Sequence, residues 1–214
     1  MRSGTPLARE MLRLPLADWA GVVVPVGFAL TIALGGNVWR LLLRYERDLP
    51  LLLSEPWRLI SAHLVHMNGA HLLLDGVAFA LIWLLFAGIL PARAWWAAFV
   101  GGCLAIDAGL YLWQPEVGWY VGLSGVEHGL FVAGAGWMAL TRRPGAALMV
   151  IGLGLKLAWE VLVGPMPWST SASRGPVIEV AHLYGTVGGL IALGLLLALD
   201  ESCRERLSVR RQGQ

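Results

Sequence analysis

Charged residues are scarce in this chain of 214 residues: Asp, Glu, Lys and Arg together make up 14% of it, while 57% is hydrophobic. An ordinary soluble domain carries a clearly larger share of charge, about 25%. The composition therefore excludes such a domain and predicts an integral membrane protein. Because a helix needs about 20 residues to cross the roughly 30 Å hydrocarbon layer, the chain has room for about six spans and for little else.

Other absences exclude further classes. Cysteine occurs only as Cys103, inside an apolar stretch, and as Cys203, in a polar tail, so we expect neither a disulfide nor a catalytic thiol. No small-x-small cleavage site follows a short apolar core at the start, so the first apolar run is expected to remain as a span. No internal repeat supports an inverted-repeat transporter. The net charge of +2 comes from basic residues between and beyond the spans, and we expect no nucleic-acid partner.

What the chain does contain is a succession of apolar segments, which we expect to form one domain over residues 1–214. Residues 35–70 interrupt them with tryptophan, leucine runs and four arginines, a composition typical of a segment that lies in the membrane interface. The expected fold class is an all-α membrane protein, a six-transmembrane-helix bundle with an interfacial first loop. The expected spans cover residues 16–34, 71–90, 95–113, 124–140, 146–163 and 177–199.

The arginines indicate the orientation. Six spans put both termini on one side of the membrane, and ten arginines fall on that side against five on the other. Since cytoplasmic loops carry the excess of basic residues, we expect both termini to be cytoplasmic. The spans that start near 71, 124 and 177 then begin at the non-cytoplasmic face. The five arginines expected on the non-cytoplasmic side are Arg40, Arg44, Arg47, Arg58 and Arg174.

A serine and a histidine lie near the starts of two of these spans. Ser124 belongs to GLSGVEHG and His182 to EVAHLYGTVGG. An imidazole that accepts the proton of a hydroxyl allows that hydroxyl to attack a carbonyl group. In a second interpretation, which the pattern leaves open, Ser124 only caps a helix and His182 only bonds between helices.

Glycines at four-residue spacing favour close contact between the two spans. Such small-xxx-small faces let helix backbones approach each other. Contact would bring Ser124 and His182 within hydrogen-bond reach. The glycines are Gly125 and Gly129 in one span and Gly185 and Gly189 in the other.

Three motifs, WRLISAHLVHMNGAHLLLD, GLSGVEHG and AHLYGTVGG, together resemble the rhomboid family of intramembrane serine proteases. They occur in the family's order, so the resemblance implies a rhomboid-like bundle. It also implies a nucleophile at Ser124, a base at His182 and the family's first-loop pair at Trp57 and Arg58. The short chain and the histidine after the serine motif, His128, are most similar to the rhombosortase subfamily.

The rhombosortase resemblance implies the substrates. They would be membrane-anchored proteins with a C-terminal transmembrane anchor that contains Gly-Gly, cut near the non-cytoplasmic face in a bacterial inner membrane. Substrate would enter laterally between the second and fifth spans. The lipid bilayer is the other expected partner, and neither a cofactor nor a metal is expected.

Three further residues match positions around the rhomboid site. His71 corresponds to the histidine of the oxyanion hole, with the Ser124 backbone N–H as a second donor. Asp75 stands where the family has an asparagine donor, and an ionised carboxylate cannot donate. Asp75 would therefore donate as a protonated acid, orient His71 or face a polar cavity. His66 matches a loop histidine that we expect to be structural.

His128 lies one helical turn after Ser124. The resemblance implies that it stacks on the catalytic histidine, and its use as the general base is the less favoured alternative. Glu127 has no firm role: it would polarise a histidine or pair elsewhere. Lys156 and Glu160, four residues apart, are expected to form a structural pair. Two further membrane-level acids are weaker candidates: Asp107, and Glu179, which would tune His182.

Two other functions remain open on the sequence alone. The first is a membrane metal-dependent hydrolase, because histidine and carboxylate ligands suit zinc, although no HExxH string is present. In that hydrolase the metal ligands would be His71, Asp75, His128 and His182.

The second alternative is a catalytically impaired rhomboid-like protein that binds anchors without cutting them.

Overall fold

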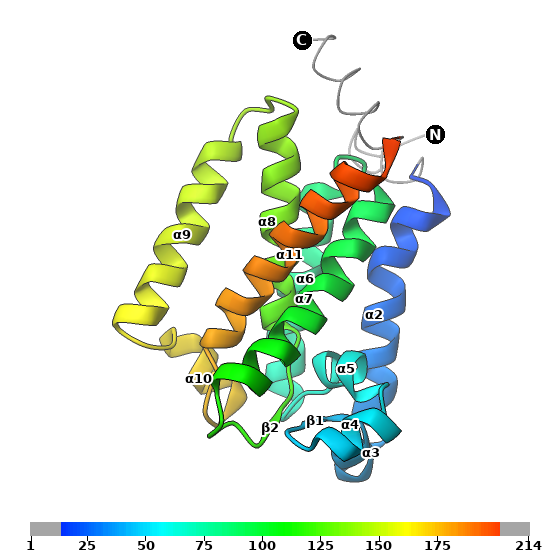
Figure 1. The fold of residues 1–214 in the computed structure, drawn as a ribbon, viewed down its shortest axis with the longest axis vertical. Helices are drawn as coiled ribbons and strands as arrows, with labels where there is room; N and C mark the ends of the chain where they lie inside the picture. The colour runs from blue at the N-terminus through cyan, green and yellow to red at the C-terminus, as the bar shows by residue number, and fades with distance from the viewer. Residues whose placement is uncertain (1–13, 202–214) are drawn as a thin grey trace, which may run out of the picture.

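The structure, a computed structural model, describes residues 14–201. Cys203 and seven of the counted arginines, which fall within residues 1–13 and 202–214, lie outside the described residues. Within the described part, six helices have 17 or more residues (Figure 1). They are α2 (Leu16–Leu34), α6 (Gly69–Phe86), α7 (Ala92–Trp113), α8 (Ser124–Leu140), α9 (Ala146–Leu162) and α11 (Val180–Leu199).

Four of the described helices, α2, α6, α7 and α11, are long and apolar enough to cross a membrane. The other two, α8 and α9, have 17 residues each. Large apolar side chains are exposed along α9, as expected of a surface that faces lipid rather than water. These include Leu148, Ile151, Leu155 and Leu162. The architecture agrees with the predicted all-α membrane protein.

Local sequence signals set the helix starts that matter for the site. Asn68 caps α6, since its side-chain oxygen accepts the N–H groups of Ala70 at 2.9 Å and His71 at 3.1 Å. α7 starts directly after Pro91. α9 starts after Gly145, which has a positive φ of 85°. The cap at Asn68 places His71 on the first turn of α6.

The centre of the bundle is made by α7, α8 and α11, with α11 packed on both of the others (Figure 1). Gly185 and Gly189 of α11 lie directly against the backbone of Gly125 and Gly129 of α8. A methyl group added to Gly185 would overlap the Gly125 carbonyl oxygen. The predicted close approach of these two helices is confirmed.

The connection from α2 to α6 folds as short elements at one end of the bundle (Figure 1). Its strand β1 (Tyr45–Glu46) pairs antiparallel with β2 (Trp119–Tyr120), which lies between α7 and α8, and Tyr45 is opposite Tyr120. Because β2 comes shortly before Ser124, this pairing ties the first loop to the segment that leads into α8. The elements of this connection are α3 (Gly36–Leu43), β1 (Tyr45–Glu46), α4 (Leu49–Ser54), α5 (Arg58–Ser61) and the 3-10 helix η1 (Ala62–Leu64).

Arg58 holds this loop together from inside. It is 4% exposed, and its guanidinium donates to the carbonyls of Leu41 at 3.0 Å and Arg44 at 2.9 Å and to Glu55 at 2.6 Å. A buried arginine needs such partners. Trp57, beside it, is half exposed. Arg58 thus belongs to the loop scaffold, and Trp57 is the backbone N-cap of α5.

Candidate active site

The chain enters α8 through a turn that requires glycine. Gly122 has a φ of 128°, which side chains of L-residues rarely adopt, and a Cβ there would lie 3.3 Å from the His71 ring. Ser124 is the first residue of α8, and the N-cap position belongs to Leu123, which makes no side-chain cap. The Ser124 hydroxyl is therefore not used as a helix cap.

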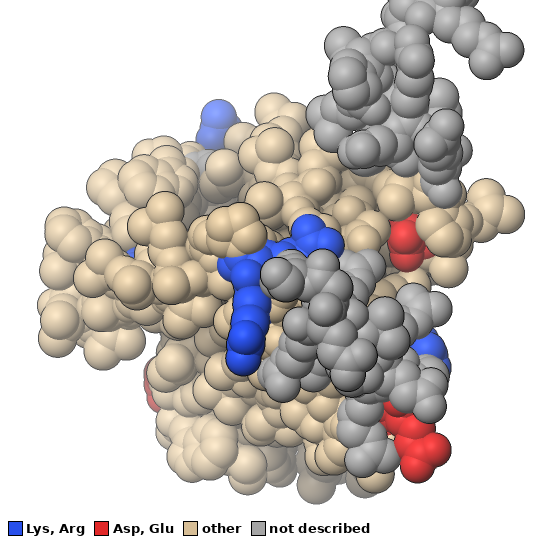
Figure 2. Space-filling view, turned by 90° about the horizontal axis from the view of Figure 1, so that it is seen from above, with Lys and Arg blue, Asp and Glu red and all other residues tan. Residues whose placement is uncertain are grey.

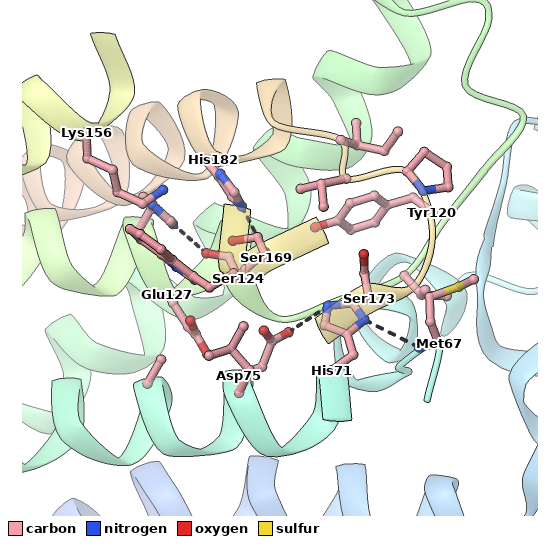
Figure 3. A pocket seen from close by; sticks show the side chains of 18 of the residues that line it. Met67, His71, Asp75, Tyr120, Ser124, Glu127, Lys156, Ser169, Ser173 and His182 are labelled. Carbon is pink, nitrogen blue, oxygen red and sulfur yellow. Dashed lines mark hydrogen bonds and ion pairs between the residues drawn. The ribbon is translucent and has the colours of Figure 1, made fainter. Parts of the chain in front are cut away.

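The Ser124 hydroxyl instead faces His182. The Ser124 Oγ and His182 Nε2 atoms lie 2.9 Å apart (Figure 3). His182 is on the first turn of α11 and is 3% exposed. The glycine contact between α8 and α11, which starts at Gly125 directly after Ser124 and at Gly185 one turn after His182, holds the two side chains at this distance.

The third member of this chain of hydrogen bonds is Glu160 of α9. Its Oε2 lies 2.9 Å from His182 Nδ1, and its Oε1 lies 2.7 Å from Lys156 Nζ. Since an ionised carboxylate only accepts hydrogen bonds, His182 carries its proton on Nδ1. The Nε2 lone pair is then free to accept the Ser124 hydroxyl proton, as a general base requires.

His128 stacks on His182, with ring centroids 4.3 Å apart and planes 14° from parallel. Its Nδ1 lies 2.6 Å from the Ser124 carbonyl oxygen, so Nδ1 donates to that oxygen. His128 therefore bonds the backbone of Ser124, whereas His182 bonds the hydroxyl. This geometry favours His182 over His128 as the base.

Asp75 of α6 lies across the site from Ser124 and His182, and several hydrogen-bond donors surround its carboxylate (Figure 3). Its Oδ2 accepts the Leu123 N–H at 3.0 Å and lies 3.1 Å from His66 Nε2 and 3.3 Å from His71 Nε2. His71 Nδ1 accepts the Met67 N–H at 3.5 Å, so the His71 proton is on Nε2. Of the three roles considered for Asp75, the geometry favours orienting His71.

These groups surround a cavity of about 570 Å³ between α6, α8, α9 and α10 (Pro167–Ser173). Its polar lining includes Ser124, His71, Asp75, Lys156 and Ser173, and apolar side chains line much of the remainder. The apolar part includes Ala78 and Ile82 of α6, Phe131 of α8 and Leu153 of α9. A cavity of this size and lining suits an extended apolar peptide segment.

Glu127 and Tyr120 are among the other polar side chains that line the cavity. Glu127 is 5% exposed, and its Oε1 has no hydrogen-bond partner among the described residues. Tyr120 donates its hydroxyl to the Gly122 carbonyl at 3.2 Å. Burial raises the pKa of Tyr120, so its hydroxyl stays protonated and supports the turn into α8.

Of the weaker sequence candidates, Asp107 and Glu179 do not bond the His182 ring among the described residues. The carboxylate of Asp107 lies 3.3 Å from the ring of His63, and Glu179 is the backbone N-cap of α11. The carboxylate that bonds the ring is that of Glu160. The sequence did not indicate the contact between Glu160 and His182, because pairing with Lys156 already accounted for the charge of Glu160. A carboxylate can nevertheless accept several hydrogen bonds, so a second partner was open to it.

The proposed zinc ligands fall into two separate groups: His71 and Asp75 on one wall, His128 and His182 on the other. Among the described residues, the candidate ligand atoms of His128, Glu160 and His182 all lie within 4.8 Å of one another. However, both His182 nitrogens are already engaged, and the lone pairs of two stacked, nearly parallel rings do not converge on one point. The geometry therefore suits hydrogen bonding better than metal ligation.

A hydroxyl, an imidazole and a carboxylate in line are the donor and acceptor set that serine hydrolases use, and here they lie within an apolar helical bundle. Residues 53–199 match the sequence model of the Rhomboid domain, which is more than half of the chain. The chain therefore belongs to the rhomboid family, a family of intramembrane proteases. No curated protein sequence matches it.

Proposed function

We propose that this rhomboid is a serine endopeptidase that cuts the membrane anchors of other proteins, with Ser124 as nucleophile and His182 as base. One observation carries the proposal: the Ser124 hydroxyl lies 2.9 Å from the unprotonated nitrogen of His182, at the edge of a peptide-sized cavity. A helix-capping serine and an interhelical histidine would not need this tautomer or this cavity.

In the proposed reaction, Ser124 Oγ attacks the scissile carbonyl carbon while its proton passes to His182 Nε2. The carbonyl oxygen becomes an oxyanion. Two donors are proposed for it: the Ser124 N–H, which the first turn of a helix leaves unpaired, and the His71 Nε2–H, which turns from Asp75 Oδ2, 3.3 Å away, toward the oxyanion. His182 then gives its proton to the leaving amine. Water next attacks the acyl carbon and gives a proton to His182 Nε2, which returns a proton to Ser124 Oγ as the bond between this oxygen and the acyl carbon breaks.

The substrate is proposed to be a C-terminal transmembrane anchor that contains Gly-Gly. Its backbone must become accessible to Ser124, and glycines weaken a helix by about 1 kcal/mol each relative to alanine. The cavity is lined by α6 and α9, so we place the lateral entrance between these helices. The motif SGVEHG, shared in outline with rhombosortases, supports this class of substrate.

We further propose that the six long helices all span a bacterial inner membrane, with cytoplasmic termini. α2 begins and α11 ends at one end of the bundle, and the first loop lies at the other (Figure 1). Figure 2, which views the former end, shows basic side chains near the middle of this face and acidic ones toward its right edge. Arg93, in the first turn of α7, and Arg142 and Arg143, between α8 and α9, lie at this end.

The arginines of the first loop have structural partners, which explains their departure from the charge rule. Arg40 donates to the Met67 carbonyl, Arg47 to the Tyr111 carbonyl at 2.8 Å, and Arg44 pairs with Glu46 at 2.6 Å. Because these bonds stabilise the loop, the loop requires its arginines whichever side of the membrane it faces. Their count is therefore weak evidence about orientation.

A fluorophosphonate probe tests the proposed chemistry. The probe is expected to label the purified protein, and peptide mass spectrometry should find the adduct on Ser124. Labelling and cleavage are expected to persist in EDTA and in 1,10-phenanthroline. Loss of cleavage in chelator with no adduct on Ser124 would favour the metal-dependent hydrolase. Anchor binding with neither an adduct nor cleavage would favour the impaired, anchor-binding protein.

Replacing His71 by alanine is expected to lower kcat by about 100-fold, because one of two oxyanion donors is lost. KM should change by less than about threefold, since this donor acts mainly in the transition state. Steady-state cleavage of a Gly-Gly-anchored reporter in proteoliposomes measures both constants. An unchanged kcat would remove His71 from the oxyanion hole.

A further inference from the structure

Glu160 occupies an unusual position on α9. Within that helix only three residues are buried, Ala146, Leu153 and Glu160, and they follow one another at a spacing of seven. This spacing marks the single stripe by which α9 faces the rest of the bundle. Its last position holds a carboxylate that is 5% exposed, where packing alone would favour an apolar side chain.

A buried carboxylate at membrane depth is costly unless it is paired. Glu160 is paired on both oxygens: Lys156 Nζ lies 2.7 Å from Oε1, and His182 Nδ1 lies 2.9 Å from Oε2. Lys156 is the only lysine in the chain. The cation balances the charge of the carboxylate and fixes its orientation, so the remaining oxygen is directed at the histidine.

The bond to His182 has two chemical consequences. It keeps the proton on Nδ1, so the Nε2 lone pair faces the Ser124 hydroxyl. It also places a negative charge beside the imidazolium that forms when Nε2 takes the serine proton. Groups that face the His182 ring are Ser124 and His128 from α8 and Glu160 from α9, and among these Glu160 is the carboxylate.

We infer that Glu160 is the positioning residue of a Ser124–His182–Glu160 triad, and that Lys156 holds Glu160 in place. This inference rests on the proposed serine protease function and adds a third helix to the catalytic machinery. Glu160 does not line the cavity, whereas Lys156 does. Glu160 thus acts through His182 and not through the substrate.

The test compares Glu160→Gln and Glu160→Ala with Glu179→Gln, a matched control that neutralises an acid three residues before His182. Both Glu160 variants are expected to lower kcat and the rate of fluorophosphonate labelling by about 100-fold or more. KM should stay within about twofold of the wild-type value, because Glu160 makes no substrate contact. Glu160→Asp is expected to recover part of the rate, and Glu179→Gln all of it.

A second measurement separates positioning from a merely structural role. The ¹⁵N spectrum of histidine-labelled protein distinguishes the two imidazole tautomers, and His182→Asn assigns the signal. We expect the Nδ1–H form in the wild type and a shift toward Nε2–H in Glu160→Ala. If a Glu160 variant fails to fold, the tautomer of His182 in the wild-type protein still tests the triad. An Nε2–H form of His182 would overturn the inference.

The two proposals fail in different ways. Glu160 variants with wild-type kcat, in a protein that Ser124→Ala inactivates, would overturn the triad and leave the protease intact. If Ser124→Ala itself retains full activity, the serine protease proposal falls and the triad with it.

Discussion

Ser124→Ala and His182→Ala are each expected to lower cleavage of a Gly-Gly-anchored reporter by about 10⁴-fold or more. Ser124→Ala removes the atom that attacks the carbonyl, and His182→Ala removes the only group that bonds its proton in the described structure. The double variant should be no slower than either single one, because the two side chains act as a unit. Cleavage in proteoliposomes, followed by gel and mass spectrometry, measures the loss.

Ser54→Ala serves as the matched control for the serine. Ser54 lies in the first loop, and its hydroxyl bonds the Leu51 carbonyl at 3.0 Å, away from the cavity. It should cleave at the wild-type rate. Membrane insertion should be the same for all of these variants, and Ser124→Ala and Ser54→Ala should keep the wild-type melting temperature in detergent. Wild-type cleavage by Ser124→Ala would exclude the proposed nucleophile.

Gly185→Ala is the second prediction with a large effect. The added Cβ would overlap the Gly125 carbonyl oxygen, and that oxygen belongs to a helix backbone that cannot rotate aside. α11 must therefore move away from α8, which separates Ser124 from His182. We expect cleavage and fluorophosphonate labelling to become undetectable, and overpacking to cost about 1–3 kcal/mol of stability.

Gly194→Ala provides a control on the same helix. A Cβ at Gly194 has nothing within 4 Å, so the substitution adds the same methyl group without an overlap. It should be fully active and at least as stable, since alanine favours a helix over glycine. Thermal unfolding in detergent and labelling rates measure both effects. Equal behaviour of the two variants would show that the α8–α11 approach does not set the catalytic distance.

Much of this arrangement could be predicted from the sequence. Apolar segments indicated the helices, and α2 and α8 occupy the predicted residues 16–34 and 124–140. The glycine pairs indicated which helices approach each other. Both signals are local and periodic, so a single sequence displays them. The start of α11 was less accurate: the span was expected from residue 177, and the helix begins at Val180, because residues before it are still part of the connection from α10.

The polar network around the pair could not be predicted in the same way. Glu160 reaches His182 from another helix. The sequence pattern of α9 does not indicate which neighbouring side chain the second carboxylate oxygen of Glu160 contacts. Asp75 was interpreted from the asparagine expected at its position, yet its surroundings decide its behaviour: it accepts the Leu123 N–H and faces the rings of His66 and His71. Such choices depend on tertiary packing and on which partner is nearest.

The narrow buried stripe of α9 has a consequence for timing. Ser124 and His182 lie on α8 and α11, whose backbones are in direct contact at glycines. Glu160 lies on α9, in which three residues are buried. If substrate enters by moving α9 aside, the acid leaves the histidine during entry and returns only when the helix closes behind the anchor. On the proposed entry route, an open gate would leave Ser124 with a disoriented base, and full reactivity would return once the substrate is enclosed.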